Sequence, residues 1–204
     1  MRHFRRRRMH QFAALLGVTQ STRVLDVGGT AENWRLLAVQ PQVTLLNMPR
    51  AQEPSWPRFE LVAADGCALP FRDQSFDIVF SNSVIEHVGT PAHQKLFAGE
   101  IQRVGRGYWV QTPNRWFPLE PHLLTPFLHY LPRPLQARSV RHWTVWDAVE
   151  RPSPDRREFY INHYLEDIRL LSASQLSALF PAAQIQRERI LGLTKSLIAI
   201  KRRA

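Results

Sequence analysis

The sequence predicts a single α/β domain with a doubly wound sheet, mostly parallel with an antiparallel C-terminal strand, and helices on both faces. Short apolar segments with strand character alternate along the chain with segments of helical periodicity, which is typical of this class. Two glycines, Gly28 and Gly29, directly follow the first predicted strand. At 204 residues and 44% apolar residues, the chain suits one domain, residues 1–204, with a sizeable core.

The predicted elements follow one another regularly through the first half of the chain. Met9, Phe12, Ala13 and Leu16 recur at helical spacing within a basic N-terminal helical segment, residues 1–20. Apolar patterning then predicts strands over residues 23–27, 42–47, 60–64, 76–81 and 107–111, and helices over residues 33–38 and 91–104.

The alternation of strand-like and helical segments ends at residues 113–160, which contain eight prolines and many aromatic residues. This stretch is too apolar for a disordered linker and too rich in proline for one long helix. We therefore expect an ordered insertion that forms a lid or an acceptor pocket. A helix over residues 172–180, capped by Ser172 or Ser174, and strands over 184–190 and 193–200, joined at Gly192, complete the domain.

The composition restricts the partners and the setting. Formal net charge is +10, and Arg2 and Arg5–Arg8 form a basic run near the N-terminus. The run is typical either of contact with nucleic acid or an anionic surface, or of a solvated tail in an arginine-rich protein. No acid precedes Asp26, as in an organelle transit peptide, but the helical stripe favours a folded segment. The single cysteine, Cys67, and the lack of a long apolar run predict a cytoplasmic protein. The sequence makes no prediction of oligomeric state.

Polar residues gather where the predicted strands end, and ligands of such sheets bind outside these carboxyl ends. The polar positions are Asp26, Gly28, Gly29 and Thr30 after the first strand, Asn47 after the second, Asp65 and Gly66 after the third, and Ser81 and Asn82 after the fourth. An acid before the glycines, without Gly-x-Gly-x-x-Gly spacing, suits a positively charged ligand better than a pyrophosphate.

Three segments resemble the class I S-adenosylmethionine-dependent methyltransferases of the small-molecule, type 11 kind. They are Val-Leu-Asp-Val-Gly-Gly at 24–29, Ala-Asp-Gly-Cys-Ala-Leu-Pro-Phe at 64–71, and Ser-Phe-Asp-Ile-Val-Phe-Ser-Asn-Ser-Val-Ile-Glu-His at 75–87. Their order and spacing are similar to that family over roughly residues 20–112. The resemblance implies a Rossmann-like fold, S-adenosylmethionine as cofactor and S-adenosylhomocysteine as product. It also implies that residues 113–160 shape the acceptor pocket.

The resemblance assigns a role to each polar position at the strand ends. Gly28 and Gly29 would let the backbone approach the methionine part of the cofactor. Asp26 would face its ammonium, Asp65 and Gly66 its adenine, and Ser81 with Asn82 would form the floor. Two departures stand out, because Thr30 and Ala31 replace the longer glycine pattern and Asn47 replaces the acid expected at the ribose hydroxyls. The amide lacks the charge that strengthens such bonds, which costs about 1 kcal/mol.

The acceptor side offers three histidines as catalytic candidates: His87, His122 and His163. A base is required only where the acceptor must lose a proton, as a hydroxyl does. No metal is predicted, because no two histidines stand at a sequence spacing typical of metal ligands with a third candidate ligand nearby. Asn114, Arg115 and Trp116, just beyond the fifth strand, are candidates for contact with the acceptor.

The sequence leaves three functions open. The first is methyl transfer to a small or lipid-like acceptor at oxygen, since the insertion is rich in aromatic residues. The second is a non-catalytic binding protein on the same fold, suggested by Asn47 and the short glycine pattern. The third is a nucleic-acid methyltransferase, suggested by the charge of +10. Against the third, the fourth strand ends in Ser-Asn-Ser-Val and lacks the Asn-Pro-Pro-Tyr type of signature.

Overall fold

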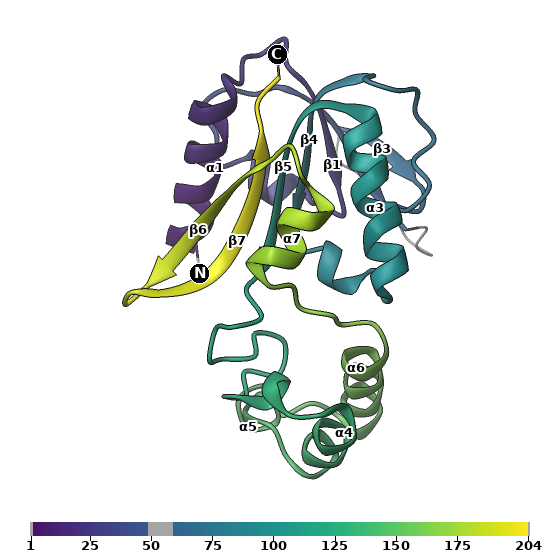
Figure 1. Ribbon diagram of the computed structural model, residues 1–204, viewed down its shortest axis with the longest axis vertical. Helices are drawn as coiled ribbons and strands as arrows, with labels where there is room; N and C mark the ends of the chain where they lie inside the picture. Colours follow the sequence, from purple (N-terminus) through teal and green to yellow (C-terminus); the bar gives the residue numbers. More distant parts are fainter. Residues whose placement is uncertain (1, 49–58, 204) are drawn as a thin grey trace.

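A seven-stranded sheet forms the centre of the molecule (Figure 1), in a computed structural model that describes residues 2–48 and 59–203, side chains from residue 5 onward. The strands are β1 (Arg23–Val27), β2 (Gln42–Asn47), β3 (Glu60–Ala63), β4 (Phe76–Asn82), β5 (Gly105–Pro113), β6 (Gln184–Ile190) and β7 (Leu193–Lys201). Their order is β3-β2-β1-β4-β5-β7-β6. β1 to β5 pair in parallel, whereas β7 is antiparallel to both β5 and β6. The predicted doubly wound sheet is confirmed.

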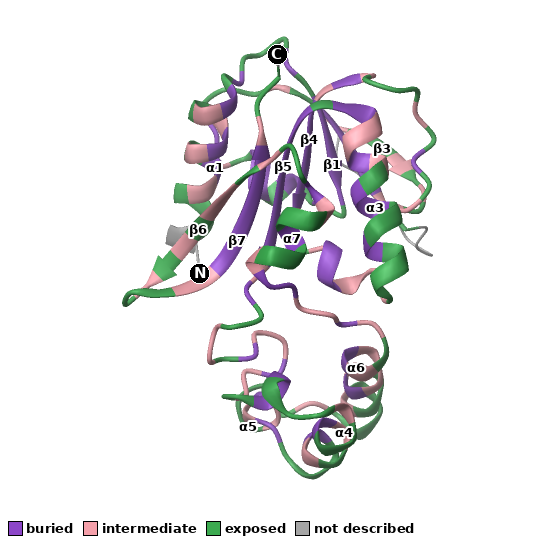
Figure 2. Ribbon diagram, in the orientation of Figure 1, coloured by how far each residue is buried: buried purple, intermediate pink, exposed green. Residues whose placement is uncertain are grey.

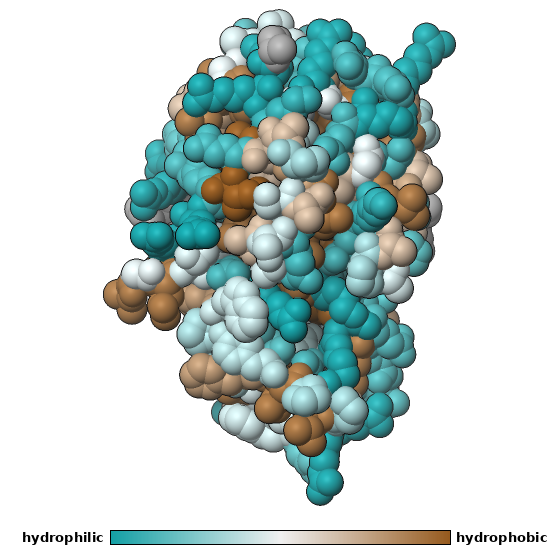
Figure 3. Space-filling model, in the orientation of Figure 1, coloured by the Kyte–Doolittle hydropathy of each residue, from teal (hydrophilic) through white to brown (hydrophobic). Residues whose placement is uncertain are grey.

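The hairpin between β6 and β7 turns at Leu191 and Gly192, whose φ angles are 49° and 81°. Two consecutive residues with positive φ match the twist of the flanking strands in a tight two-residue turn. The tip is apolar and forms a projecting patch in Figure 3, with Leu191 98% exposed.

Helices cover both faces of the sheet, and the side facing the sheet is the buried side of each (Figure 2). α1 (Arg2–Leu16) and α2 (Ala31–Trp34) pack on one face, where Met9, Phe12 and Trp34 join the core. α3 (Pro91–Val104) and α7 (Ala173–Leu179) pack on the other, where Phe97 and Phe180 are buried.

The predicted helix over residues 33–38 is wrong, because α2 is a single turn that ends at Trp34. The side-chain amide of Gln40 donates to the carbonyls of Leu37 (2.6 Å) and Trp34 (3.3 Å). These carbonyls are acceptors that a continuing helix would use for its own backbone, so the chain turns toward β2.

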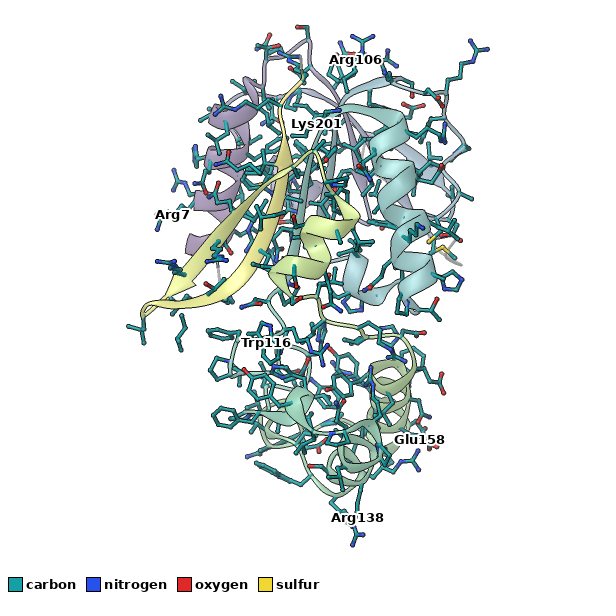
Figure 4. All side chains as sticks on the ribbon, in the orientation of Figure 1. Arg7, Arg106, Trp116, Arg138, Glu158 and Lys201 are labelled. Carbon is teal, nitrogen blue, oxygen red and sulfur yellow. The ribbon has the colours of Figure 1, made fainter. Side chains whose placement is uncertain are left out.

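The predicted N-terminal stripe is buried against the sheet. Phe12 is 0% exposed and meets the rings of Phe80, Trp34 and Trp109 edge-on at centroid distances of 4.9, 5.8 and 5.8 Å. The outer side of α1 carries Arg7, which points away from the sheet in Figure 4. Contact of the arginine run with an anionic surface stays a prediction, and the side chain of Arg2 lies outside the described residues.

Truncating this aromatic contact should destabilise the domain. We expect Phe12→Ala to lower the free energy of unfolding by about 3–5 kcal/mol, through lost burial and the cavity left behind. Chemical denaturation of both proteins measures the change. Leu96→Ala is the control, because Leu96 is 55% exposed on α3 and its truncation should change stability by less than about 0.5 kcal/mol. Equal effects of the two substitutions would contradict this account of α1.

The insertion forms a separate helical body beyond the carboxyl end of β5 (Figure 1). It contains η2 (Leu128–Tyr130), α4 (Arg133–His142), α5 (Val145–Glu150) and α6 (Pro154–Glu166) around a small core of its own. Its two ends lie together, because Asn114 and Leu171 form a parallel bridge. Pro134 and Pro154 lie in the first turns of α4 and α6, where a missing N–H costs little. The prolines therefore begin short helices, which the sequence analysis did not predict.

The fold has no helix that is both long and apolar enough to span a bilayer within residues 2–48 and 59–203.

Candidate functional site

A cavity of about 530 Å³ opens at the carboxyl ends of β1, β2, β3 and β4. This is where the strand order reverses direction, the usual ligand position in a doubly wound sheet. Four of the nine residues predicted to bind the cofactor line it: Gly28, Asn47, Asp65 and Gly66. Of the three predicted catalytic histidines, His87 lines it.

Only glycine fits the turn that follows β1. Gly28 has a φ of +76°, and a Cβ at this position would lie 2.5 Å from Cγ2 of Val84. A Cβ on Gly29 would overlap the carboxylate of Asp26. Gly28 therefore borders the cavity without a side chain in between, whereas Gly29 lies against Asp26.

Asp26 is fully buried under this turn and does not line the cavity. Its Oδ2 accepts a hydrogen bond from Nε1 of Trp34 (2.8 Å). Its Oδ1 has no hydrogen-bond partner within the described part of the chain. Burial raises the pKa of Asp26 to about 7, although the Trp34 bond opposes the rise. The predicted contact with an ammonium stays a prediction, supported by one unpartnered oxygen.

The raised pKa of Asp26 makes stability depend on pH. Because the folded-state pKa of about 7 exceeds the ordinary 3.8, the unfolded chain loses this proton at a lower pH than the folded chain does. Protonated Asp26 makes its full contribution to the free energy of unfolding below about pH 4. This contribution is lost as the pH rises from about 4 to about 7. We expect Asp26→Asn to be more stable than the wild type by up to about 4 kcal/mol at pH 8, with a much smaller gain at pH 5.

Chemical denaturation at pH 5 and pH 8 measures this difference. Asp155→Asn is the matched control, because Asp155 is exposed at the start of α6 and should give no such gain. A gain for Asp26→Asn that is equal at both pH values would contradict the buried-acid account.

The other strand ends shape the cavity wall. Asn47 donates from Nδ2 to the carbonyl of Gly29 (3.0 Å), which a carboxylate could not do. The amide at this position thus holds the end of β2 to the glycine turn. Asp65 accepts from the N–H of Cys67 (2.8 Å), and a Cβ on Gly66 would lie 2.7 Å from the ring of Phe97.

Three further predicted cofactor residues lie outside the cavity wall, and two of them have side-chain partners elsewhere. Ser81 donates to the carbonyl of Val27 (3.2 Å), and Oδ1 of Asn82 accepts from Arg8 (2.6 Å). Thr30 is the N-cap residue of α2 and makes no side-chain capping bond. Their roles toward the cofactor stay predictions.

Arg8 is a residue that the sequence analysis did not single out from the arginine run. Its guanidinium makes two bonds to Glu188 on β6 (2.9 and 2.6 Å) and one to Gln111 on β5 (2.9 Å), besides the bond to Asn82. The middle of α1 is thereby held to β6 and to the carboxyl-end halves of β4 and β5. Only the exceptional density of arginine near residue 8 hinted at this role.

The three predicted catalytic histidines lie together, although they come from distant parts of the chain. His87 ends η1 (Ile85–His87), His122 lies in the insertion, and His163 lies on α6. Nε2 of His87 is 3.2 Å from Nε2 of His122. The rings of His87 and His163 stack with centroids 5.6 Å apart.

Carboxylates orient two of these rings. Nδ1 of His122 is 2.7 Å from Glu120, a fully buried acid that also accepts from the N–H of His122 and of Leu123. Nδ1 of His163 is 2.8 Å from Asp167, which lines the cavity. Burial, and then the charges of its two neighbouring histidines, lower the pKa of His87 to about 4.

Glu86 is a buried acid beside this cluster that the sequence analysis did not select. Oε2 accepts from the hydroxyl of Thr112 (3.0 Å), whereas Oε1 has no partner among the residues that the structure describes. Burial raises the pKa of Glu86 to about 7. Ligand atoms of Glu86, His87 and His122 all lie within 4.8 Å of one another, a set that could hold a metal ion. Sequence spacing could not show this, because His122 is 35 residues from His87.

The residues predicted to contact the acceptor lie outside the cavity wall. Asn114 is nearly buried and donates to the carbonyl of Thr194 (2.8 Å). Trp116 is 64% exposed and lies at the junction of the sheet with the helical body (Figure 4). Arg115 borders a second cavity of about 340 Å³, together with Arg133 and Arg169. Their contact with an acceptor stays a prediction.

Comparison with known proteins finds a family model described as a methyltransferase domain, which matches residues 16–107. Two uncharacterized proteins from two strains of Mycobacterium tuberculosis are each 29% identical over 136 residues, which is 64% of this chain. The chain spans 45% of the length of these relatives.

Solved methyltransferase structures share the fold. A 1,6-didemethyltoxoflavin-N1-methyltransferase from Burkholderia thailandensis, bound to 1,6-didemethyltoxoflavin and S-adenosylhomocysteine, is 17% identical with a TM-score of 0.57, over 97% of this chain and 78% of that chain. A SAM-dependent methyltransferase from Methanosarcina mazei is 12% identical with a TM-score of 0.50, over 90% and 92%. At these identities the similarity is one of fold.

Proposed function

We propose that this chain, whose residues 16–107 match a methyltransferase domain model, is a class I S-adenosylmethionine-dependent methyltransferase that transfers a methyl group to a small or lipid-like acceptor at oxygen. The observation that carries the proposal is the glycine-walled cavity at the carboxyl ends of the strands.

The residues present fit the cofactor. Side chains are excluded at Gly28 and Gly66, so backbone borders the cavity at both points. Asp65, which lines the cavity, has a second carboxylate oxygen beyond its bond to Cys67. This oxygen suits the adenine amino group. S-adenosylmethionine supplies an electrophilic methyl group on a sulfonium, and this chain supplies the pocket.

The acceptor side is the part of the cavity that faces the helical body. Glu166 and Asp167, at the end of α6, line the cavity together with His87 from the sheet side. Holding the acceptor in line with the methyl group supplies much of the rate gain in such a displacement. Apolar side chains in the cavity wall, among them Val84, Val88 and Phe97, support an apolar acceptor.

An acceptor hydroxyl must lose its proton, and we assign its removal to His163, whose ring stacks on that of the cavity-lining His87. Asp167 holds Nδ1 of His163, which leaves Nε2 as the nitrogen that can receive a proton. The carboxylate fixes the tautomer and stabilises the imidazolium that forms. His87 stacks beside it and lines the cavity, and we assign His87, which His122 contacts from outside the cavity wall, to positioning the acceptor.

A screen of acceptors with S-adenosylmethionine labelled at the methyl group tests the transfer. We expect label to move to a hydroxyl-bearing, apolar small molecule. Transfer to no acceptor by a chain that binds the cofactor would favour the non-catalytic alternative. Label found in RNA or DNA, with binding that weakens steeply as salt rises, would favour the nucleic-acid alternative.

A further inference from the structure

We propose that Glu86, His87 and His122 bind one divalent transition-metal ion, of the Zn²⁺ class, at the wall of the cavity. Metal binding follows from these residues alone. The role of the ion in activating the acceptor rests on the proposed function.

The two imidazoles already stand at the separation that a shared ion requires. Nε2 of His87 and Nε2 of His122 are 3.2 Å apart. Two nitrogens bound to a tetrahedral zinc ion at about 2.05 Å each stand about 3.3 Å apart. The two nitrogens form a hydrogen bond whose donor and acceptor depend on the tautomers, and a bound ion would replace this contact. Each ring keeps its Nδ1 for other partners.

Glu86 supplies the third ligand. It is fully buried, and Oε1 has no hydrogen-bond partner in the described ranges. An unpartnered carboxylate oxygen in the interior is costly unless a cation or a proton satisfies it. The three ligand atoms lie within 4.8 Å of one another, so movements of about 1 Å bring them onto one ion.

Partners outside the ligand set orient two of the three ligands. Glu120, itself buried, holds Nδ1 of His122 at 2.7 Å, the carboxylate–histidine arrangement common at zinc sites. The hydroxyl of Thr112 donates to Oε2 of Glu86 (3.0 Å) and leaves Oε1 for the ion. Two nitrogens and one carboxylate suit Zn²⁺, Co²⁺ or Fe²⁺ better than Mg²⁺ or Ca²⁺.

Three protein ligands leave a fourth position open for an exogenous oxygen. His87 lines the cavity, so an acceptor there can reach this position. Coordination acidifies the acceptor hydroxyl, and its proton passes to Nε2 of His163. The oxygen then forms the new C–O bond with the methyl group as the C–S bond of the donor breaks and its electron pair returns to sulfur. The ion is neither oxidised nor reduced.

Titration of the chelator-treated chain with Co²⁺, followed by visible absorption, tests the site. We expect one Co²⁺ per chain, with the intense bands of four-coordinate geometry, and displacement of Co²⁺ by Zn²⁺. His122→Gln and Glu86→Gln should each weaken binding at least about 100-fold. His142→Gln is the matched control, because His142 is exposed at the end of α4 and should bind Co²⁺ as the wild type does.

His122→Cys separates loss of a metal ligand from a folding defect, because cysteine can also bind the ion but does so through a thiolate instead of an imidazole. We expect it to bind Co²⁺ with a new thiolate charge-transfer band. Absence of uptake by the wild type, or equal uptake by wild type, His122→Gln and Glu86→Gln, would overturn the proposal. Calorimetry with S-adenosylmethionine is read separately, so failure of cofactor binding is distinguishable from failure of metal binding.

Discussion

A chain with Gly28→Val should show no heat of binding with S-adenosylmethionine or S-adenosylhomocysteine where the wild type saturates. We expect affinity to fall at least about 100-fold, or about 2.7 kcal/mol. The new side chain would start 2.5 Å from Val84 and would extend over the cavity floor. It would also hold a β-branched residue at a φ of +76°, which only glycine adopts readily. Isothermal titration calorimetry measures the loss.

Gly99→Val separates this local effect from the general cost of replacing a glycine. Gly99 lies on α3, and a Cβ there meets nothing within 4 Å. This variant should bind the cofactor as the wild type does. Circular dichroism shows whether Gly28→Val keeps its fold, and a folded Gly28→Val chain with unchanged affinity would contradict the assignment of the cavity.

The second large effect is expected at His163. Replacement by glutamine should lower kcat by about 10²–10⁴-fold, because the acceptor proton loses the group that takes it. The affinity for S-adenosylmethionine should stay unchanged, since His163 lies on α6 against His87, whereas the cofactor is assigned to the glycine turn and the ends of β1–β3. Asp167→Asn should lower kcat less, through misorientation of the imidazole. Initial rates of label transfer, with the acceptor that the screen finds, measure both.

His142→Gln is the control for these rates, since His142 lies exposed on α4. A pH–rate profile adds a second readout, because loss of a base removes the rise in kcat that its deprotonation causes. Full activity of His163→Gln would assign proton removal to another group and would contradict this step.

Most of the sheet could be predicted from the sequence because its strands are short, apolar and bounded by polar residues. β1 and β2 have the predicted limits, since a buried parallel strand leaves a continuous apolar run. β5 is longer than the predicted 107–111, because Thr112 and Pro113 pair with β7 across the sheet. That pairing partner lies more than 80 residues away along the chain, so a local sequence pattern cannot predict it.

The cavity wall was predicted in part, for a similar reason. Gly28, Asn47, Asp65 and Gly66 follow strands that the sequence marks clearly, and the topology carries them to one edge. Asp26 alternates to the opposite face of β1, where it meets Trp34 rather than the cavity.

The acceptor side depended on the folding of the insertion. In the sequence the three histidines are separate candidates, far apart along the chain. The packing of α6 and the 120–122 loop against η1 brings them together. Glu86 could not be predicted, because a local sequence pattern does not show that an acid is buried. Arg8 could not be predicted, because nothing in the sequence distinguishes it from the neighbouring arginines.

Calorimetric titration of the wild-type chain with S-adenosylmethionine, in parallel with Gly28→Val, tests the central claim most directly. The cavity at the carboxyl ends of β1–β4 predicts one saturable site per wild-type chain and no heat from the variant. Absence of binding by the wild type at millimolar cofactor, or equal binding by both chains, would contradict it.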